Sequence, residues 1–164
     1  MFDTKHTLVA LVEDKPGVLN RAVSLFRRRG FNIQSLAVGG SERPGLSRMT
    51  VVVDGDSATV EQVRKQLDKL INVVRVSDIT NEGIVARELA LIKVKGTTST
   101  RSEIMQIADI FRANIVDVAP DSLTVEVTGD QDKVESLIGL LKSFGIKEIS
   151  RTGRIALTRG AAKG

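Results

Sequence analysis

The same order of secondary-structure signals occurs twice in this 164-residue chain, and this repeat constrains the fold more than any other feature. In each half, a β-prone run precedes a segment with helical spacing, two further strand-like runs, a second helical segment and a final strand-like run. This β-α-β-β-α-β order is the split βαβ arrangement, in which four strands form one sheet and both helices cover one face. The sequence therefore predicts an α+β protein with two modules of the same topology.

In the first half, apolar residues recur at helical spacing after Pro16-Gly17, from Val18 onward. Gly30 is placed to end this helix in the left-handed conformation, and Ser57 is expected to cap the second helix. The strands expected here cover residues 7–12, 31–38, 49–53 and 73–76.

The second half repeats the pattern after Gly83. The segment Thr100-Arg101-Ser102-Glu103 has the spacing of a capping box, and Asp130 is expected to begin the last helix, which Gly145 ends. The expected strands cover residues 89–94, 115–118, 123–127 and 146–157. We therefore expect two ferredoxin-like βαββαβ domains, 1–80 and 81–158, followed by a flexible basic tail over 159–164.

Each module is small, and a core of about 80 residues or fewer rarely provides more than a few kcal/mol of stability. The chain has no cysteine, so neither disulfides nor cysteine-based zinc sites can supplement that core. Pairing through a sheet edge or a helix face into a homodimer is therefore expected.

The net charge of +4 does not indicate a nucleic-acid binder, because it arises at one end of the chain. Lys and Arg number 20 through Ser150, and Asp and Glu also number 20, so the body is neutral. The N-terminal apolar run is too short for a signal peptide, and no stretch approaches the roughly 18 apolar residues of a membrane span. A cytoplasmic protein with no membrane partner is expected.

Catalytic and metal-binding patterns are weak. The single histidine, His6, has no second histidine or cysteine with which to share a metal, and no serine lies in a nucleophile-elbow sequence. The acidic pairs Glu13-Asp14 and Asp54/Asp56 lie at element ends, where solvated carboxylates are common. No phosphate-binding glycine motif is present. We expect a binding protein with no catalytic residue, no metal and no cofactor of its own.

RNA binding is one alternative, because RNA-recognition modules share the βαββαβ order. Arg29-Gly30-Phe31 resembles their basic-glycine-aromatic signature, but it follows the first helix instead of lying on the third strand. The third-strand segment, residues 48–53, has no aromatic ring on which a base could stack. The sequence therefore argues against a nucleic-acid partner.

The loop between the first strand and the first helix is the most informative segment. Gly17 allows a ligand to approach backbone N–H groups at a helix N-terminus, which suits a carboxylate. Asp14 can accept from an ammonium group, and Asn32, at the start of the second strand, can orient a polar head group. These groups suit the zwitterion of an α-amino acid. The alternative is that Asp14 and Pro16-Gly17 only cap the helix.

The loop and two later segments of the first half resemble the small regulatory subunit of acetolactate synthase (acetohydroxyacid synthase). The segments are 12–19, 25–33 and 46–50, and the match continues over 87–94, 110–118 and Gly160, so it covers nearly the whole chain. The D-x-P-G-V-L run alone indicates an ACT domain, an amino-acid-sensing module. The L-S-R-M-T run and the second-half segments resemble this subunit family specifically.

The resemblance implies a non-catalytic partner of the acetolactate synthase large subunit. Such a subunit raises the activity of the large subunit and confers feedback inhibition by valine in branched-chain amino acid biosynthesis. It also implies an N-terminal ACT domain, a second ferredoxin-like domain and a homodimer formed through the ACT domains. Thiamine diphosphate, Mg²⁺ and FAD are expected in the large subunit.

In this family the effector lies between the ACT domains of two chains, and the matching positions here are Asp14, Gly17 and Asn32. The expected valine site uses the amides of Gly17 and Val18 for the carboxylate, Asp14 for the ammonium, and Asn32 from the facing chain. Asparagine often occupies the position of Asp14, so the preference among valine, leucine and isoleucine stays open. The alternative function is a stand-alone ACT-type sensor that regulates another enzyme or a transporter.

Overall fold

The computed structural model describes residues 4–160 and divides the chain into two compact units. The first unit runs to Val85 and includes the chain again from Arg154 onward. The second unit is Ala86–Gly153. Each unit contains one βαββαβ motif, so the predicted α+β architecture is confirmed.

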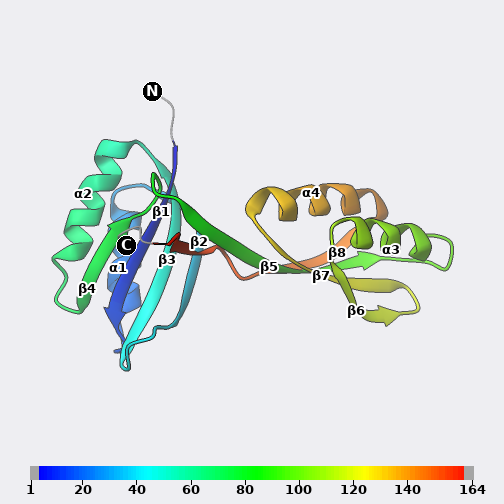
Figure 1. The fold of residues 1–164 in the computed structure, drawn as a ribbon, viewed down its shortest axis with the longest axis horizontal. Coiled ribbons are helices and arrows are strands. Elements are labelled where there is room, and N and C mark those ends of the chain that lie inside the picture. The colour runs from blue at the N-terminus through cyan, green and yellow to red at the C-terminus, as the bar shows by residue number, and fades with distance from the viewer. Residues whose placement is uncertain (1–3, 161–164) are drawn as a thin grey trace. The chain divides into compact units, whose positions relative to one another are not determined.

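The first unit has one four-stranded antiparallel sheet in the order β2-β3-β1-β4 (Figure 1). Its elements are β1 (Thr4–Glu13), α1 (Val18–Arg28), β2 (Asn32–Gly40), β3 (Leu46–Gly55), α2 (Ser57–Asp68) and β4 (Val73–Asp78). Alternate residues of β1, among them Leu8 and Ala10, pack with Phe26 of α1 and Leu67 of α2 in one core. Both helices therefore cover the same face of this sheet.

The second unit repeats the arrangement with the strand order β6-β7-β5-β8, and a fifth strand, β9 (Ile155–Thr158), also pairs with β5. Its elements are β5 (Ile84–Lys95, which begins in the first unit), α3 (Arg101–Ile110), β6 (Asn114–Ala119), β7 (Ser122–Gly129), α4 (Gln131–Leu141), a short 3-10 helix (Lys142–Phe144) and β8 (Ile146–Arg151). Ile92, Ile104 and Leu137 belong to a second core cluster, which shares no residue with the first. Each unit thus has its own hydrophobic core.

The helix ends confirm two predictions and correct two others. Gly30 and Gly145 follow helical segments with φ of 74° and 96°, the left-handed region that favours glycine. The cap of α2 is Asp56 and not Ser57, because the Asp56 carboxylate accepts from the Thr59 amide at 2.9 Å. Thr100 precedes α3, but its side chain makes no capping bond to that helix, so the predicted capping box does not form.

The predicted final strand over 146–157 is wrong, because the chain breaks it at Gly153, where φ is 82°. β8 ends at Arg151, and a separate strand, β9 (Ile155–Thr158), belongs to the first unit. The expected domain boundaries 1–80 and 81–158 therefore differ from the observed ones. The reason is that the chain after Gly153 returns to the first unit and hydrogen-bonds there.

Three side chains attach this C-terminal segment to the first unit. Arg154 donates to the Thr7 hydroxyl at 3.1 Å, and Arg48 donates to the Ala156 carbonyl at 2.8 Å. The Arg159 amide donates to the Gly83 carbonyl at 2.8 Å, and its side chain bonds the Ile84 carbonyl. Figure 1 shows this red segment in front of the sheet, whereas α1 lies behind it. Of the expected tail 159–164, residues 161–164 lie outside the described residues.

Candidate functional site

The loop between β1 and α1 leaves the start of α1 without a side-chain cap. Gly17 is the residue before the helix, with φ 83° and ψ −11°, and no side chain bonds the first turn. The Val18 amide reaches only the Lys15 carbonyl, at a long 3.4 Å. Since the first amides of a helix have no intrahelical acceptor, this end offers N–H donors and a positive partial charge to an anion.

Asp14 is held by its backbone and not by its side chain. Its amide donates to the Gly45 carbonyl of the β2–β3 loop at 2.9 Å. Its exposed carboxylate makes no hydrogen bond or ion pair with any residue in the range 4–160. The capping interpretation of Asp14 is therefore not supported, and the carboxylate is available to a ligand.

Asn72, at the turn before β4, stabilises this loop and was not among the predicted site residues. Its carbonyl accepts from the Glu13 amide at 2.8 Å, and its side-chain amide donates to the Glu13 carboxylate at 2.9 Å. Arg21 of α1 donates to the Asn72 side-chain oxygen at 2.7 Å. Asn72 thus connects β1, α1 and β4 at one end of the sheet. Glu13 and Asn72 are 59 positions apart in the sequence, which explains why no local pattern indicates this contact.

Glu13 lies beside the site but is already paired. Lys15 donates to its carboxylate at 2.9 Å, and together with the Asn72 amide it lowers the pKa of Glu13 below the usual range. The carboxylate is therefore ionised at neutral pH and neutralised by Lys15. Among the two neighbouring acids, Asp14 is the one that remains to meet an ammonium group.

The structure does not bring the four predicted site residues together within one chain. These residues are Asp14, Gly17, Val18 and Asn32. Val18 presents only its backbone, because its side chain is buried in the core of the first unit. Asn32 is exposed and lies level with Lys5, since both are register neighbours of Asp54 on β3. Glu13 is eight residues farther along β1, which corresponds to about 26 Å. Asn32 therefore lies at the opposite end of the sheet from Gly17.

His6 is more buried than a strand-end residue is expected to be, with 5% of its surface exposed. Its Nδ1 lies 2.9 Å from a carboxylate oxygen of Asp78, and Thr80 donates to the other oxygen through its amide and hydroxyl. Burial raises the pKa of Asp78, but the bonds from Thr80 and then His6 outweigh it, so the pKa is lowered overall. These contacts connect β1 to the end of β4, which is a structural role.

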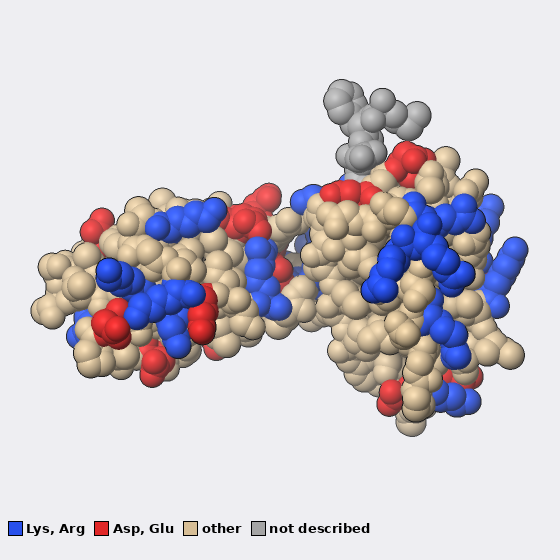
Figure 2. Space-filling model, turned by 180° about the vertical axis from the view of Figure 1, so that it is seen from behind, with Lys and Arg blue, Asp and Glu red and all other residues tan. Residues whose placement is uncertain are grey.

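The three consecutive arginines at the end of α1, Arg27, Arg28 and Arg29, are all exposed. Figure 2 views the molecule from behind, on the helix side of the first unit, and shows Lys and Arg gathered there. Cations at this end complement the C-terminal dipole of α1.

Within residues 4–160, no group of three or more His, Asp or Glu side chains is placed to hold a metal ion. In the same range, no helix is both long enough and apolar enough to span a membrane.

Comparison with known proteins gives one consistent result for both halves. Residues 8–75 match the family described as the AHAS small subunit-like ACT domain, and residues 87–160 match the small subunit of acetolactate synthase. A probable acetolactate synthase small subunit of Archaeoglobus fulgidus is 58% identical over 159 residues, covering 97% of this chain and 99% of that protein.

Two further relatives extend this comparison. The acetolactate synthase small subunit of Mycobacterium bovis is 53% identical over 160 residues, covering 98% of this chain and 95% of that protein. The crystal structure of the acetolactate synthase small subunit of Thermotoga maritima superimposes with a TM-score of 0.88. That structure is 45% identical and covers 97% of this chain and 99% of its own.

Proposed function

Because this chain belongs to the family of acetolactate synthase small subunits and carries an ACT domain, we propose that it regulates a catalytic large subunit. In this proposal it activates acetolactate formation and makes it sensitive to valine, an end product of branched-chain amino acid biosynthesis. The chain itself is not catalytic. Thiamine diphosphate, Mg²⁺ and FAD then belong to the large subunit. The main support is the similarity over nearly the whole length of named small subunits.

The start of α1 supports an amino-acid site. The uncapped amides after Gly17 can donate to the valine carboxylate, and the exposed Asp14 carboxylate can accept from the ammonium. Both groups lie on one loop, which the Asn72 bonds to Glu13 and Arg21 hold in place. A zwitterion needs one anion-binding and one cation-binding group close together, and this loop provides both.

The edge strand β2 supports a site that two copies share. Among the described residues, β2 pairs only with β3, so its other edge is open to a second chain. If two β2 strands pair antiparallel about a twofold axis near Leu36, Asn32 of one copy lies beside Gly40 of the other. Gly40 is level with Ser47 and Val12, at the end of the sheet that carries the Gly17 loop. A homodimer through this edge therefore brings Asn32 of one copy to the same end of the sheet as Gly17 of the other.

Inhibition follows from linkage. Valine can lower activity only if it binds the inhibited arrangement of the complex more tightly than the activating one. Since the proposed site needs groups from two copies, valine binding favours one geometry of the dimer. The large subunit then responds to that geometry and needs no contact with valine.

The test of the regulatory role measures acetolactate formation from pyruvate by the large subunit of the same organism, supplied with thiamine diphosphate, Mg²⁺ and FAD. The full chain is added, and valine is then titrated. We expect the rate to rise with the chain and to fall with valine. An unchanged rate in both steps, with a complex present, contradicts the proposal. Valine binding without any effect on the rate favours the stand-alone sensor.

The test of the shared site uses two variants that are defective alone. Asn32→Ala and Gly17→Asp should each weaken valine binding by roughly tenfold or more in calorimetry, because each removes or opposes a charge-assisted bond. The matched control is Asn81→Ala, an exposed asparagine in the turn after β4. When the two defective variants are mixed, about half of the dimers contain one copy of each, and one of the two sites in such a dimer is intact. Tight binding should therefore return at about one site in four. No recovery in mixed dimers argues for a site within one chain.

A further inference from the structure

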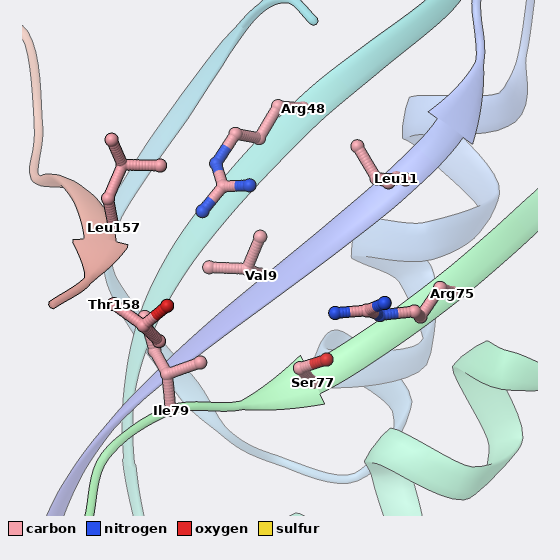
Figure 3. A pocket seen from close by; sticks show the side chains of 8 residues that line it. All are labelled: Val9, Leu11, Arg48, Arg75, Ser77, Ile79, Leu157 and Thr158. Carbon is pink, nitrogen blue, oxygen red and sulfur yellow. The ribbon is translucent and has the colours of Figure 1, made fainter. Parts of the chain in front are cut away.

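A pocket lies in the first unit, on the face of the sheet opposite the helices. It has a volume of ≈ 180 Å³ and is lined by Val9, Leu11, Arg48, Arg75, Ser77, Ile79, Leu157 and Thr158. Figure 3 shows side chains from β1, β3, β4 and β9 around it. One water molecule needs roughly 10–15 Å³ by this measure, whereas pockets that bury drug-sized ligands are larger, at about 300–1,000 Å³. The pocket therefore has room for a small organic molecule.

The strand register places two arginines in one row across the sheet. Leu11 of β1 is the direct neighbour of Arg48 on β3 and of Arg75 on β4. Directly opposed residues lie about 5 Å apart, so both arginines flank Leu11 on the same face. In Figure 3 their guanidinium groups extend into the pocket from its two sides. This row concentrates two positive charges above an apolar floor.

These two charges are not neutralised within the described chain. Arg48 uses one N–H for the Ala156 carbonyl, and neither arginine has a carboxylate within ion-pair distance among residues 4–160. No Asp or Glu lines the pocket. Glu13, the next open-face position along β1, pairs with Lys15 and Asn72 instead. Two unpaired guanidinium groups in a concave site attract an oxyanion.

The remaining lining residues define the rest of the ligand. Val9, Leu11, Ile79 and Leu157 are aliphatic, and Ser77 and Thr158 carry hydroxyls. Aliphatic walls favour an apolar body, and the absence of a lining carboxylate leaves an ammonium group without a partner. We propose that this pocket binds a small organic carboxylate with an aliphatic body and no amino group. It is a second ligand site, chemically distinct from the amino-acid site at Gly17.

Ligand binding here should also stabilise β9 on the sheet. Leu157 and Thr158 come from β9, whereas the other lining residues come from or follow the sheet strands β1, β3 and β4. A ligand that contacts both parts binds only while β9 is docked, so binding favours the docked state by mass action. The amides of Ala156 and Leu157 should therefore exchange more slowly with solvent in the presence of the ligand.

The experiment titrates three probes into the ¹⁵N-labelled full chain and follows amide and arginine Nε–H resonances by NMR. The probes are 3-methylbutanoate, valine and inorganic phosphate. The first two share a carboxylate and a branched aliphatic body and differ in the amino group. We expect 3-methylbutanoate to shift the signals of Leu11, Ser77 and both arginines. Valine should leave these signals unchanged and shift those around Gly17.

Three variants test the role of the arginines. Arg75→Gln and Arg48→Gln should each weaken 3-methylbutanoate binding by roughly tenfold, because each removes a charge-assisted bond. Arg27→Gln, an exposed arginine on α1, is the matched control and should change nothing. Arg75 is exposed, and its side chain makes no hydrogen bond or ion pair among residues 4–160, so its variant should fold normally and keep its response to valine.

Several outcomes overturn this inference without affecting the proposed function. One is that 3-methylbutanoate binds the Arg75→Gln and Arg48→Gln variants as tightly as the natural chain. Another is that phosphate competes as strongly as 3-methylbutanoate, which indicates a general anion site. A third is that valine shifts the pocket signals as much as 3-methylbutanoate does. A pocket lined by no Asp or Glu should disfavour the ammonium group of valine. If the Arg75→Gln variant no longer responds to valine, the pocket and the valine site are not separate, which also contradicts the proposal.

Discussion

The two units share one topology but differ where their first helices begin. In the first unit, Gly17 precedes α1 in the left-handed conformation, and no side chain caps the helix. In the second unit, hydroxyls fill the corresponding turn: the Thr97 amide donates to the Thr100 hydroxyl at 2.9 Å, and Thr97 bonds Ser99 at 2.8 Å. Neither helix has a side-chain cap, so the two units differ in the loop before the helix: a left-handed glycine in the first unit and mutually bonded hydroxyls in the second.

The second helices show no such difference. Asp56 caps α2 by accepting from Thr59, and Asp130 caps α4 by accepting from Lys133, both at 2.9 Å. Both carboxylates lie just after the third strand of their unit. At the helix starts, the two units therefore differ in the loop before the first helix and agree in the cap of the second. Duplicated topology does not by itself imply duplicated function.

The largest expected effect tests whether the two cores are independent. Phe26→Ala in the first core should cost about 3–5 kcal/mol, and Leu137→Ala in the second about 2–5 kcal/mol, because both side chains are fully buried. Hydrogen exchange should show the lost protection confined to the unit that carries the substitution. Leu140→Ala, an exposed leucine on α4, is the control and should cost little. Equal loss in both units contradicts separate cores.

The next prediction compares the two helix starts directly. Gly17→Asp should weaken valine binding by roughly a hundredfold, since it places a like charge beside the carboxylate. Thr100→Asp makes the matched change before α3 and should leave valine affinity unchanged. Calorimetric titration of both variants provides the measurement. A weakened response in Thr100→Asp assigns a ligand to the second unit.

Acid stability should depend on Asp78 in the first unit. The pKa of Asp78 is lowered in the folded state, where Thr80 and His6 bond its carboxylate. The stability that the ionised Asp78 carboxylate contributes is therefore present above its unfolded pKa of about 3.9. It is lost as the pH falls through the lower pKa of the folded state. Asp78→Asn should reduce the unfolding free energy by about 1–3 kcal/mol at pH 7 and by less near pH 3.

Denaturant unfolding at both pH values measures this difference. Asp109→Asn, an exposed acid on α3 without a side-chain bond in the described chain, is the control and should be close to neutral. A cost for Asp78→Asn that stays constant between pH 7 and pH 3 contradicts the ionised state of Asp78.

The smallest expected effects concern the aspartate caps of α2 and α4, which both units share. Asp56→Ala and Asp130→Ala should each cost about 1 kcal/mol of stability, because each removes a helix cap. Ser57→Ala should cost less than Asp56→Ala, since Asp56 makes the capping bond. Thermal unfolding of the three variants measures the ranking. If Ser57→Ala costs more than Asp56→Ala, Ser57 is the cap after all.

Most of the fold could be predicted from the sequence because its signals are local. The period of the apolar residues reports on the buried face of each strand and helix, and Gly30 and Gly145 mark helix ends through their positive φ. Errors occurred where two local signals were adjacent, as with Asp56 and Ser57. The break at Gly153 was missed because the residues on both sides are strand-like.

The candidate loop could also be found from sequence, because Asp14, Gly17 and Val18 are close neighbours along the chain. The separation of Asn32 from them could not be seen, since it depends on the strand order β2-β3-β1-β4 and on register. For the same reason the contacts of Asn72 with Glu13 and Arg21 carry no sequence signal.

The sequence by itself determined two βαββαβ motifs, the glycines Gly30 and Gly145 that end helical segments, and a candidate ligand loop, because propensity, periodicity and glycine conformation act over a few residues. Only the tertiary structure decided that β9 returns to the first unit and that Arg48 and Arg75 flank Leu11. Strand register and the return of β9 bring together residues that are far apart in sequence. The stability of these contacts comes from the packing of the whole unit. Local patterns therefore indicate the elements, whereas the pocket that Arg48 and Arg75 line exists only in the folded chain.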